Sequence, residues 1–167
     1  MKHRLSERLK FLSKKYVSLA SLSSSSNIVD NPLIEASTEI DKTLPGLRLE
    51  PDSKETKDQL REPIIIRQFP FFIGRELSVN EKTPSLRVQL KIRDSEPFQI
   101  SRVHLVVQRF QDDRFLVRDL DSRLGTIVDG KAIGRKFSDD LFRLPKQGAS
   151  ITVGGVISPY NFRVTPI

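Results

Sequence analysis

From Pro63 to the C-terminus the chain is a succession of short runs rich in valine, isoleucine, phenylalanine and threonine. Glycine, proline, aspartate or serine bounds each run. Runs of this length and composition are typical of β-strands. No segment with helical periodicity separates them, which argues against parallel strands joined by helices. We therefore expect an all-β domain over residues 63–167, built as a β-sandwich around one core.

The expected strands follow one another closely, and one turn between them is well defined. Asp129-Gly130 joins two of the runs, and this dipeptide favours the tight turn of a β-hairpin because both of its positions need positive φ. The runs that predict strands are Ile64–Ile66, Phe71–Ile73, Leu86–Ile92, His104–Gln108, Arg114–Leu120, Gly125–Val128, Lys131–Ile133, Ala149–Val153 and Tyr160–Thr165.

The first 62 residues have a different pattern. Leu5, Leu9, Leu12, Tyr16 and Leu19 recur at spacings of four and three, which predicts a basic amphipathic helical segment over residues 1–26. Such a helix docks on a partner or on its own chain, and the alternative is a helix that lies on an anionic membrane. Residues 27–62 are polar and acidic with scattered prolines, so we expect an acidic flexible linker there.

Composition narrows the function. The chain has no cysteine and only two histidines, so disulfides, a cysteine nucleophile, a metal site and a bound cofactor are not expected. No apolar run approaches the ~20 residues that span a bilayer, and no secretory signal is evident, so we expect a cytoplasmic protein. The formal net charge is +7, and residues 63–167 alone carry +6. A basic domain favours an anionic partner without specifying which.

Three motifs and a late glycine pair follow in order within the predicted sandwich. The motifs are Phe72-Ile-Gly-Arg75, Ile100-Ser-Arg-Val-His104 and Asp119-Leu-Asp-Ser-Arg-Leu-Gly-Thr-Ile-Val-Asp-Gly130, and Val153-Gly-Gly155 comes after them. Each motif alone is weak. Their order and strand context together resemble the forkhead-associated (FHA) family over nearly all of residues 63–167, and none of residues 1–62.

The resemblance implies an eleven-stranded sandwich of the SMAD/FHA-like type, with peptide-binding loops gathered at one end. It implies that Arg75 and Ser101 contact a phosphothreonine and that Arg102 helps. This fits the residue types, because a phosphate needs a fork-shaped cation and short donors rather than a base or nucleophile. Gly74 leaves room for a close backbone approach. The resemblance implies that His104 braces the loops and has no catalytic role.

The third motif departs from the family pattern. Arg123-Leu124 stands where many members have a pair ending in asparagine, which bonds the peptide backbone. Leucine cannot make that bond, so the grip on the peptide must differ: either Arg123 compensates as a cation or the ligand is held less specifically. Gly125 and Thr126 are expected to be structural, and Asp129 with Gly130 to form the turn. The polar loop Glu76–Pro84 is placed to shape selectivity.

The sequence therefore predicts a non-enzymatic signalling adaptor that binds phosphothreonine in a protein partner, with a Ser/Thr kinase upstream. The alternative is a divergent FHA domain that binds a partner without phosphate. Binding of nucleic acid or of a membrane surface is less expected, because no recognition helix or aromatic platform is evident. A phosphorylated threonine of the linker (Thr38, Thr43 or Thr56) could also fold back into the site.

Overall fold

The computed structural model describes residues 44–110 and 113–167. The helical segment expected over residues 1–26, the linker up to residue 43, and Thr38 and Thr43 lie outside these residues. The described elements are β1 (Leu47–Pro51), α2 (Lys54–Lys57), β2 (Ile64–Ile66), β3 (Phe71–Arg75), β4 (Leu90–Ile92), β5 (Leu105–Arg109), β6 (Phe115–Asp119), β7 (Thr126–Val128), β8 (Lys131–Ile133), β9 (Leu141–Arg143), β10 (Ala149–Val153) and β11 (Asn161–Pro166).

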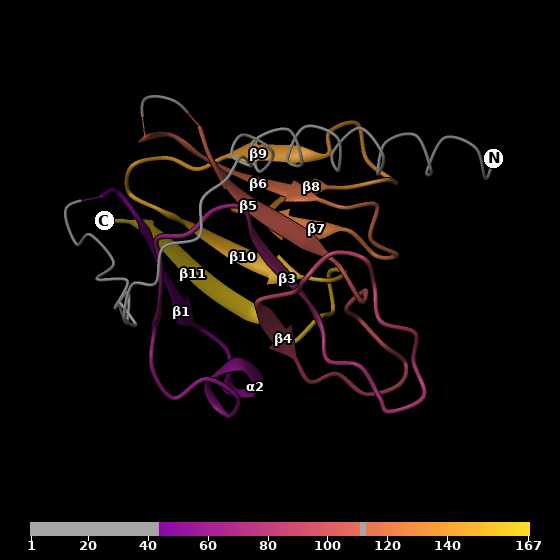
Figure 1. Cartoon of the computed structure of the whole chain (residues 1–167). Coiled ribbons are helices and arrows are strands. Elements are labelled where there is room, and N and C mark those ends of the chain that lie inside the picture. Colours follow the sequence, from indigo (N-terminus) through magenta and orange to yellow (C-terminus); the bar gives the residue numbers. More distant parts are fainter. Residues whose placement is uncertain (1–43, 111–112) are drawn as a thin grey trace, which may run out of the picture. The chain divides into compact units, whose positions relative to one another are not determined.

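The strands form two sheets. One has six strands in the order β2-β1-β11-β10-β7-β8, and the other has five in the order β4-β3-β5-β6-β9. Among the described residues, neighbouring strands are antiparallel except β3 with β4, which run parallel. Figure 1 shows the two sheets, with long loops extending beyond β3 and β4. The predicted all-β sandwich of eleven strands is confirmed.

Strand β1 corrects the predicted boundary of the domain. It lies within the stretch that we expected to be a flexible linker, and it pairs with β2 on one side and β11 on the other. Leu47 and Leu49 are fully buried, and Arg48 between them is exposed. The pattern offers only two apolar residues, between Pro45-Gly46 and Pro51, so its local signal is weak. Its pairing partner β11 lies more than a hundred residues away, so the strand depends on contacts that no local pattern contains.

Helix α2 is a second departure from the predicted linker. Ser53 caps it, and Ser53 and Thr56 exchange hydrogen bonds in a capping box. The Thr56 hydroxyl lies 2.9 Å from the carbonyl oxygen of Asn161 at the start of β11, and the residue is only 1% exposed. Thr56 is therefore part of the folded domain, and the expectation that it could serve as an accessible phosphorylation site is wrong for this residue.

Two strands differ from the sequence pattern. The alternating run Leu86–Ile92 forms a strand only over Leu90–Ile92. Just before it, Gln89 contacts β3 with its side chain: the Phe72 N–H donates to Gln89 Oε1 at 2.8 Å, and the Gln89 N–H donates to the Phe72 carbonyl at 3.0 Å. Strand β9 was not predicted, because it is short and lies at a sheet edge with half-exposed apolar residues.

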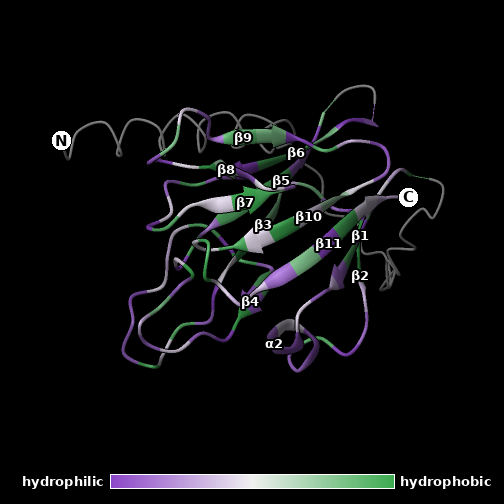
Figure 2. Ribbon diagram, turned by 180° about the vertical axis from the view of Figure 1, so that it is seen from behind, coloured by the Kyte–Doolittle hydropathy of each residue, from purple (hydrophilic) through white to green (hydrophobic). Residues whose placement is uncertain are grey.

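The core lies between the two sheets. Alternate residues of facing strands fill it, among them Ile73 of β3, Val107 of β5, Ile151 of β10 and Phe162 of β11. Burial of such side chains is the main source of stability in a sandwich. Figure 2 shows both hydrophobic and hydrophilic colours along the strands, and hydrophilic colour on α2 and many connecting segments.

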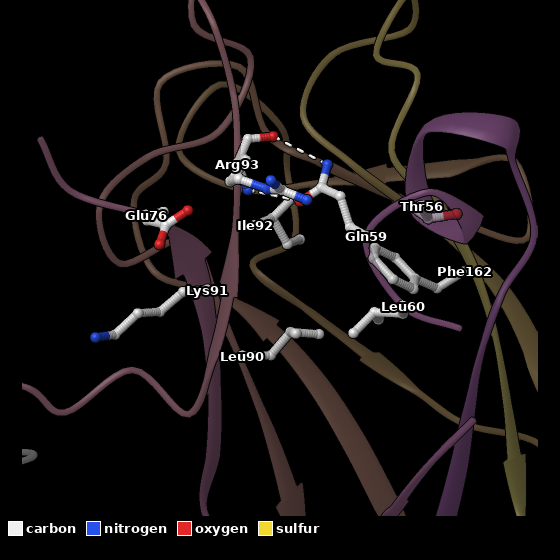
Figure 3. A pocket seen from close by; sticks show the side chains of 9 residues that line it. All are labelled: Thr56, Gln59, Leu60, Glu76, Leu90, Lys91, Ile92, Arg93 and Phe162. Carbon is white, nitrogen blue, oxygen red and sulfur yellow. Dashed lines mark hydrogen bonds between the residues drawn. The ribbon is translucent and has the colours of Figure 1, made fainter. Parts of the chain in front are cut away.

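A small pocket of about 260 Å³ lies where α2 meets β4. Figure 3 shows the Gln59 side chain bonded to the main chain of Arg93, with Leu60, Leu90 and Phe162 nearby. The Arg93 N–H donates to Gln59 Oε1 at 2.7 Å, and Gln59 Nε2 donates to the Arg93 carbonyl at 3.1 Å. The segment that follows α2 is thereby fastened to the end of β4.

Candidate functional site

Arg75 is the last residue of β3, and the preceding glycine determines how closely the next loop can approach it. A Cβ on Gly74 would lie 2.2 Å from the Arg102 carbonyl oxygen, so only glycine fits. The close approach allows the Arg75 N–H to donate to the Ser101 carbonyl at 3.0 Å. The main chain thus joins the first two motifs side by side.

The Arg75 guanidinium has a carboxylate partner in the loop that follows β3. Nη1 donates to Glu81 Oε2 at 2.8 Å, and Nη2 donates to Glu81 Oε1 at 2.6 Å. The guanidinium carbon also lies 3.9 Å from the centre of the Phe98 ring. Arg75 is only 7% exposed, and its Nε is buried without a hydrogen-bond partner. Both ends of the fork therefore bind an anion already supplied by the chain.

Arg75 and Glu81 form a strong ion pair. The hydrogen bonds from Arg75 lower the pKa of Glu81 to about 2, and the contact with Glu81 raises the pKa of Arg75. Both groups remain charged throughout the physiological range. The fork consequently binds two oxygens of a full carboxylate.

Ser101 lies on the loop between β4 and β5, next to Arg123 of the following motif. The Arg123 N–H donates to Ser101 Oγ at 3.0 Å, and its guanidinium donates through Nη2 to the Phe98 carbonyl. A hydroxyl that accepts a bond keeps its own proton to donate. Arg75 and Arg123 thus contact the ring and the carbonyl of the same residue, Phe98, with Ser101 adjacent to both.

His104 fastens two loops beneath this site. It is fully buried; its Nδ1 accepts from the Ser101 N–H, and Nε2 lies 3.0 Å from the Gly125 carbonyl. These partners place the ring proton on Nε2, which donates to Gly125. Burial lowers the pKa of His104 despite the Asp119 carboxylate 3.7 Å away, so the ring is neutral. The residue links the Ser101 loop to the Gly125 loop.

Asp119 organises the third motif. Its carboxylate accepts from the Ser122 N–H at 2.8 Å, from the Ser122 hydroxyl at 2.7 Å and from the Thr126 hydroxyl at 2.7 Å. Ser122 Oγ in turn accepts from the Gly125 N–H at 2.9 Å. Gly125 has φ +86° and faces the Phe137 ring at a distance that would exclude a Cβ. This buried network fixes the path of the loop that carries Arg123.

Leu124 and the predicted turn lie in different places. Leu124 is half-buried and lies beside Gly155 of the loop between β10 and β11. Asp129 and Gly130 have φ of 46° and 77° and form the β7–β8 turn, at the other end of β7 from Thr126. The Asp129 carboxylate accepts from the Ser150 N–H at 2.8 Å. Asp129 and Gly130 therefore do not belong to the site around Arg75 and Ser101.

Arg102 opens onto a cavity together with Arg75. The cavity has a volume of about 1070 Å³ and is lined by both arginines and by residues 83–91. Arg102 itself is exposed. Of the predicted contacts, Arg75 and Arg102 share this cavity, Ser101 and Arg123 are bonded to each other, and Leu124 lies at the neighbouring loop.

Residues that the sequence did not single out complete the site. The Asp94 carboxylate accepts from the N–H groups of Gln99 and Ile100 and from the Tyr160 hydroxyl, which positions the loop that carries Phe98 and Ser101. Burial is the largest cause of the raised pKa of Tyr160, so that hydroxyl stays a donor. Glu81 and Phe98 lie outside the sequence motifs. Their roles depend on the positions that the folded loops give them.

The described ranges contain no group of three or more histidine, aspartate or glutamate side chains that could hold a metal ion. Within the same ranges, no helix is both long enough and apolar enough to cross a membrane.

Comparisons with known proteins agree with this fold. The FHA domain model matches residues 71–154. Among solved structures, the yeast Pml1 splicing factor, described with its integration into the RES complex, is 19% identical with a TM-score of 0.56, and the match covers 74% of this chain and 80% of that chain. The FHA domain of the CT664 protein from Chlamydia trachomatis is 16% identical with a TM-score of 0.50, and the match covers 72% of this chain and 96% of that chain.

No curated protein matches the sequence closely enough to be compared with it. The structural likenesses support the fold, and the family model spans half of the chain, from the strand that ends in Arg75 to the first glycine after β10. The chain therefore belongs to the FHA domain family, whose members are protein-interaction modules.

Proposed function

We propose that this chain is a non-enzymatic adaptor that binds phosphothreonine in a protein partner modified by a Ser/Thr kinase. The observation that carries the proposal is the Arg75 fork, which grips two carboxylate oxygens next to the Ser101 loop. A guanidinium that binds one oxyanion in this two-pronged geometry is equally suited to a phosphate. FHA family membership supports a protein as the partner.

The neighbouring residues suit the remaining oxygens of the ligand. A phosphothreonine carries about −1.5 to −2 charges and three acceptor oxygens at pH 7. In this proposal Arg75 takes two oxygens, the Ser101 hydroxyl donates to the third, and Arg102 adds a cation at the edge of the shared cavity. Arg123 contributes charge next to Ser101.

The hydrogen bonding, charge and exposure of the side chains at the site also support a binding role. His104 is neutral, fully buried and bonded on both ring nitrogens, so it has no free nitrogen with which to act as a base. Apart from the Glu81 carboxylate, which is paired with Arg75, the exposed or half-exposed groups of the site are cations and a hydroxyl, which bind anions without changing them. This arrangement favours recognition over catalysis.

The direct test is titration of the full chain with a fluorescent phosphothreonine peptide library, in parallel with phosphoserine and unphosphorylated versions. We expect binding to depend on the phosphate, and to weaken by about tenfold or more in Arg75→Lys, which keeps the charge and loses the fork. Ser101→Ala should also weaken phosphopeptide binding, whereas the control Arg163→Ala should have a smaller effect. Arg163 is exposed on β11 of the other sheet. Equal binding of plain and phosphorylated peptides would end this proposal.

A second candidate is a partner bound without phosphate, and one observation favours it. Leu124 lies beside Gly155, and the next two residues, Val156 and Ile157, are 86% and 85% exposed. Exposed branched residues next to a leucine offer an apolar contact where the family often has an asparagine. In this case a double change of Val156 and Ile157 to serine would abolish capture of the partner, and Arg75→Lys would leave it intact.

A further inference from the structure

We propose that Glu81 is an internal competing ligand, which occupies the Arg75 fork and sets the affinity that an incoming anion must exceed. This inference rests on the proposed function, because it concerns the same arginine. It adds a residue of the loop Glu76–Pro84 that determines how strongly the site binds. The alternative role for Glu81 is to orient Arg75 for the ligand, and the two roles predict opposite results.

Glu81 takes the positions that a phosphate would need. Its two oxygens contact the two terminal nitrogens of Arg75 at 2.6 and 2.8 Å, so the outward face of the fork is filled. The remaining nitrogen, Nε, is buried without a partner and faces no free path to a ligand. An external phosphate can therefore reach the fork only after Glu81 leaves it.

Arg75 does not need Glu81 to hold its place. The guanidinium packs at 3.9 Å on the Phe98 ring, and the residue is 7% exposed at the end of β3. Phe98 is itself held through its carbonyl, which accepts from Arg123. These contacts leave the side chain oriented when the carboxylate departs, which favours competition over orientation.

The segment that carries Glu81 is built to release it. Glu81 accepts from the Ser78 N–H at 3.0 Å and from the Ser78 hydroxyl at 3.1 Å, and its own N–H donates to the Ser78 carbonyl at 3.0 Å. These bonds close a turn of four residues and stay within it. Ser78, Val79 and Asn80 are all exposed, so the turn can move away without disturbing the core.

An internal carboxylate sets a threshold of affinity for every incoming anion through its advantage in concentration. A tethered group meets its partner at an effective concentration of about millimolar or more. A free aspartate or glutamate brings the same two oxygens and the same single charge, so it gains little by exchange. A phosphate brings a third oxygen and more charge, which Ser101 and Arg102 are positioned to use. Glu81 thus lowers the affinity of every anion by a common factor, which leaves carboxylates below a useful level.

The experiment compares three proteins by isothermal titration with one phosphothreonine peptide and with the same peptide carrying glutamate instead. Glu81→Gln should bind the phosphopeptide about tenfold more tightly than the wild type and bring the glutamate peptide into the measurable range. Glu76→Gln is the matched control: it removes the same charge from an exposed residue of the same loop, whose contact with Arg75 uses its main-chain carbonyl. Its affinity should stay within about twofold of the wild type.

A second readout reports displacement directly. In the wild type, the Ser78 amide resonance should shift when the phosphopeptide binds, because its acceptor Glu81 moves. The outcomes separate the two proposals. Tighter binding by Glu81→Gln supports the competitor, even if the wild type itself does not bind, in which case only the proposed function of the unmodified chain fails. Equal or weaker binding by Glu81→Gln overturns the competitor and leaves the proposed function standing where the wild type binds. If neither protein binds, both proposals fall.

Discussion

The network around Asp119 and the ion pair of Arg75 with Glu81 are joined through Ser101 and His104, yet they differ in what satisfies their polar groups. In the network, every bond links residues that are buried and fixed by strands or tight loops. In the ion pair, a buried arginine is bound by a side chain from an exposed turn.

This difference separates support from contact. A buried carboxylate that satisfies three donors cannot be exchanged for an outside group, because the donors would be left unsatisfied in the interior. A carboxylate at the surface can be exchanged, because solvent and ligand both reach it. The first cluster should therefore control stability, and the second should control binding.

The largest effect is expected from Asp119→Ala. The substitution leaves two hydroxyl donors and one N–H without their acceptor in the interior, and each such group costs about 1–3 kcal/mol. We expect the free energy of unfolding to fall by about 3 kcal/mol or more, measured by urea denaturation. The control is Asp139→Ala, which removes an exposed partner of Lys131 and should cost about 0–1 kcal/mol. Equal costs for the two variants would break the comparison.

A smaller effect should follow from pH. The pKa of His104 is lowered by burial, so between its folded and unfolded values only the unfolded chain binds the proton. Stability should therefore decline as pH falls below about 6.5, the ordinary value for histidine. His104→Gln should flatten this decline between pH 7 and pH 5, whatever its effect at pH 7. Urea midpoints at several pH values would measure it, and an unchanged slope in the variant would assign the decline to another group.

The smallest effect on folding is expected from Glu81→Gln. The pKa of Glu81 is lowered to about 2, so its contribution to stability is fully present above the ordinary glutamate value of about 4.3 and is lost as pH falls toward 2. Glu81 extends from an exposed turn, where solvent screens the ion pair and keeps this contribution small. From pH 7 to pH 5 the urea midpoint of the variant should therefore lie only slightly below that of the wild type, with the same dependence on pH. A large loss of stability in Glu81→Gln would show that the ion pair belongs to the scaffold after all.

Much of the fold could be predicted from sequence because β-type runs and turn residues are local signals. Asp129-Gly130 specified its hairpin, and the runs around Ile73, Val107 and Ile151 formed core strands. Strand β1 escaped prediction because two leucines between prolines carry little pattern, and its partner β11 is distant in the chain. The strand predicted over Leu86–Ile92 was too long, because Gln89 bonds to β3 partly through its side chain.

The same distinction between local and long-range signals applies to the residues of the site. Arg75, Ser101 and His104 lie in motifs whose spacing marks them, and the structure brings all three into one connected region. Glu81 could not be chosen from the polar residues of its loop, because the choice depends on the path of the chain after Arg75. Asp94 likewise acquires its role only when Tyr160 and the Phe98 loop meet around it.

The position of β1 has a consequence for how much sequence makes one working unit. The family match begins at Phe71, but β1 lies inside its sheet, with β2 on one flank and β11 on the other. A fragment that began at Phe71 and kept the C-terminus would leave β11 with a row of unpaired main-chain groups, the kind of open edge that recruits foreign strands. By pairing with β11, β1 covers this edge, although the residues ahead of the match carry no signature of the family.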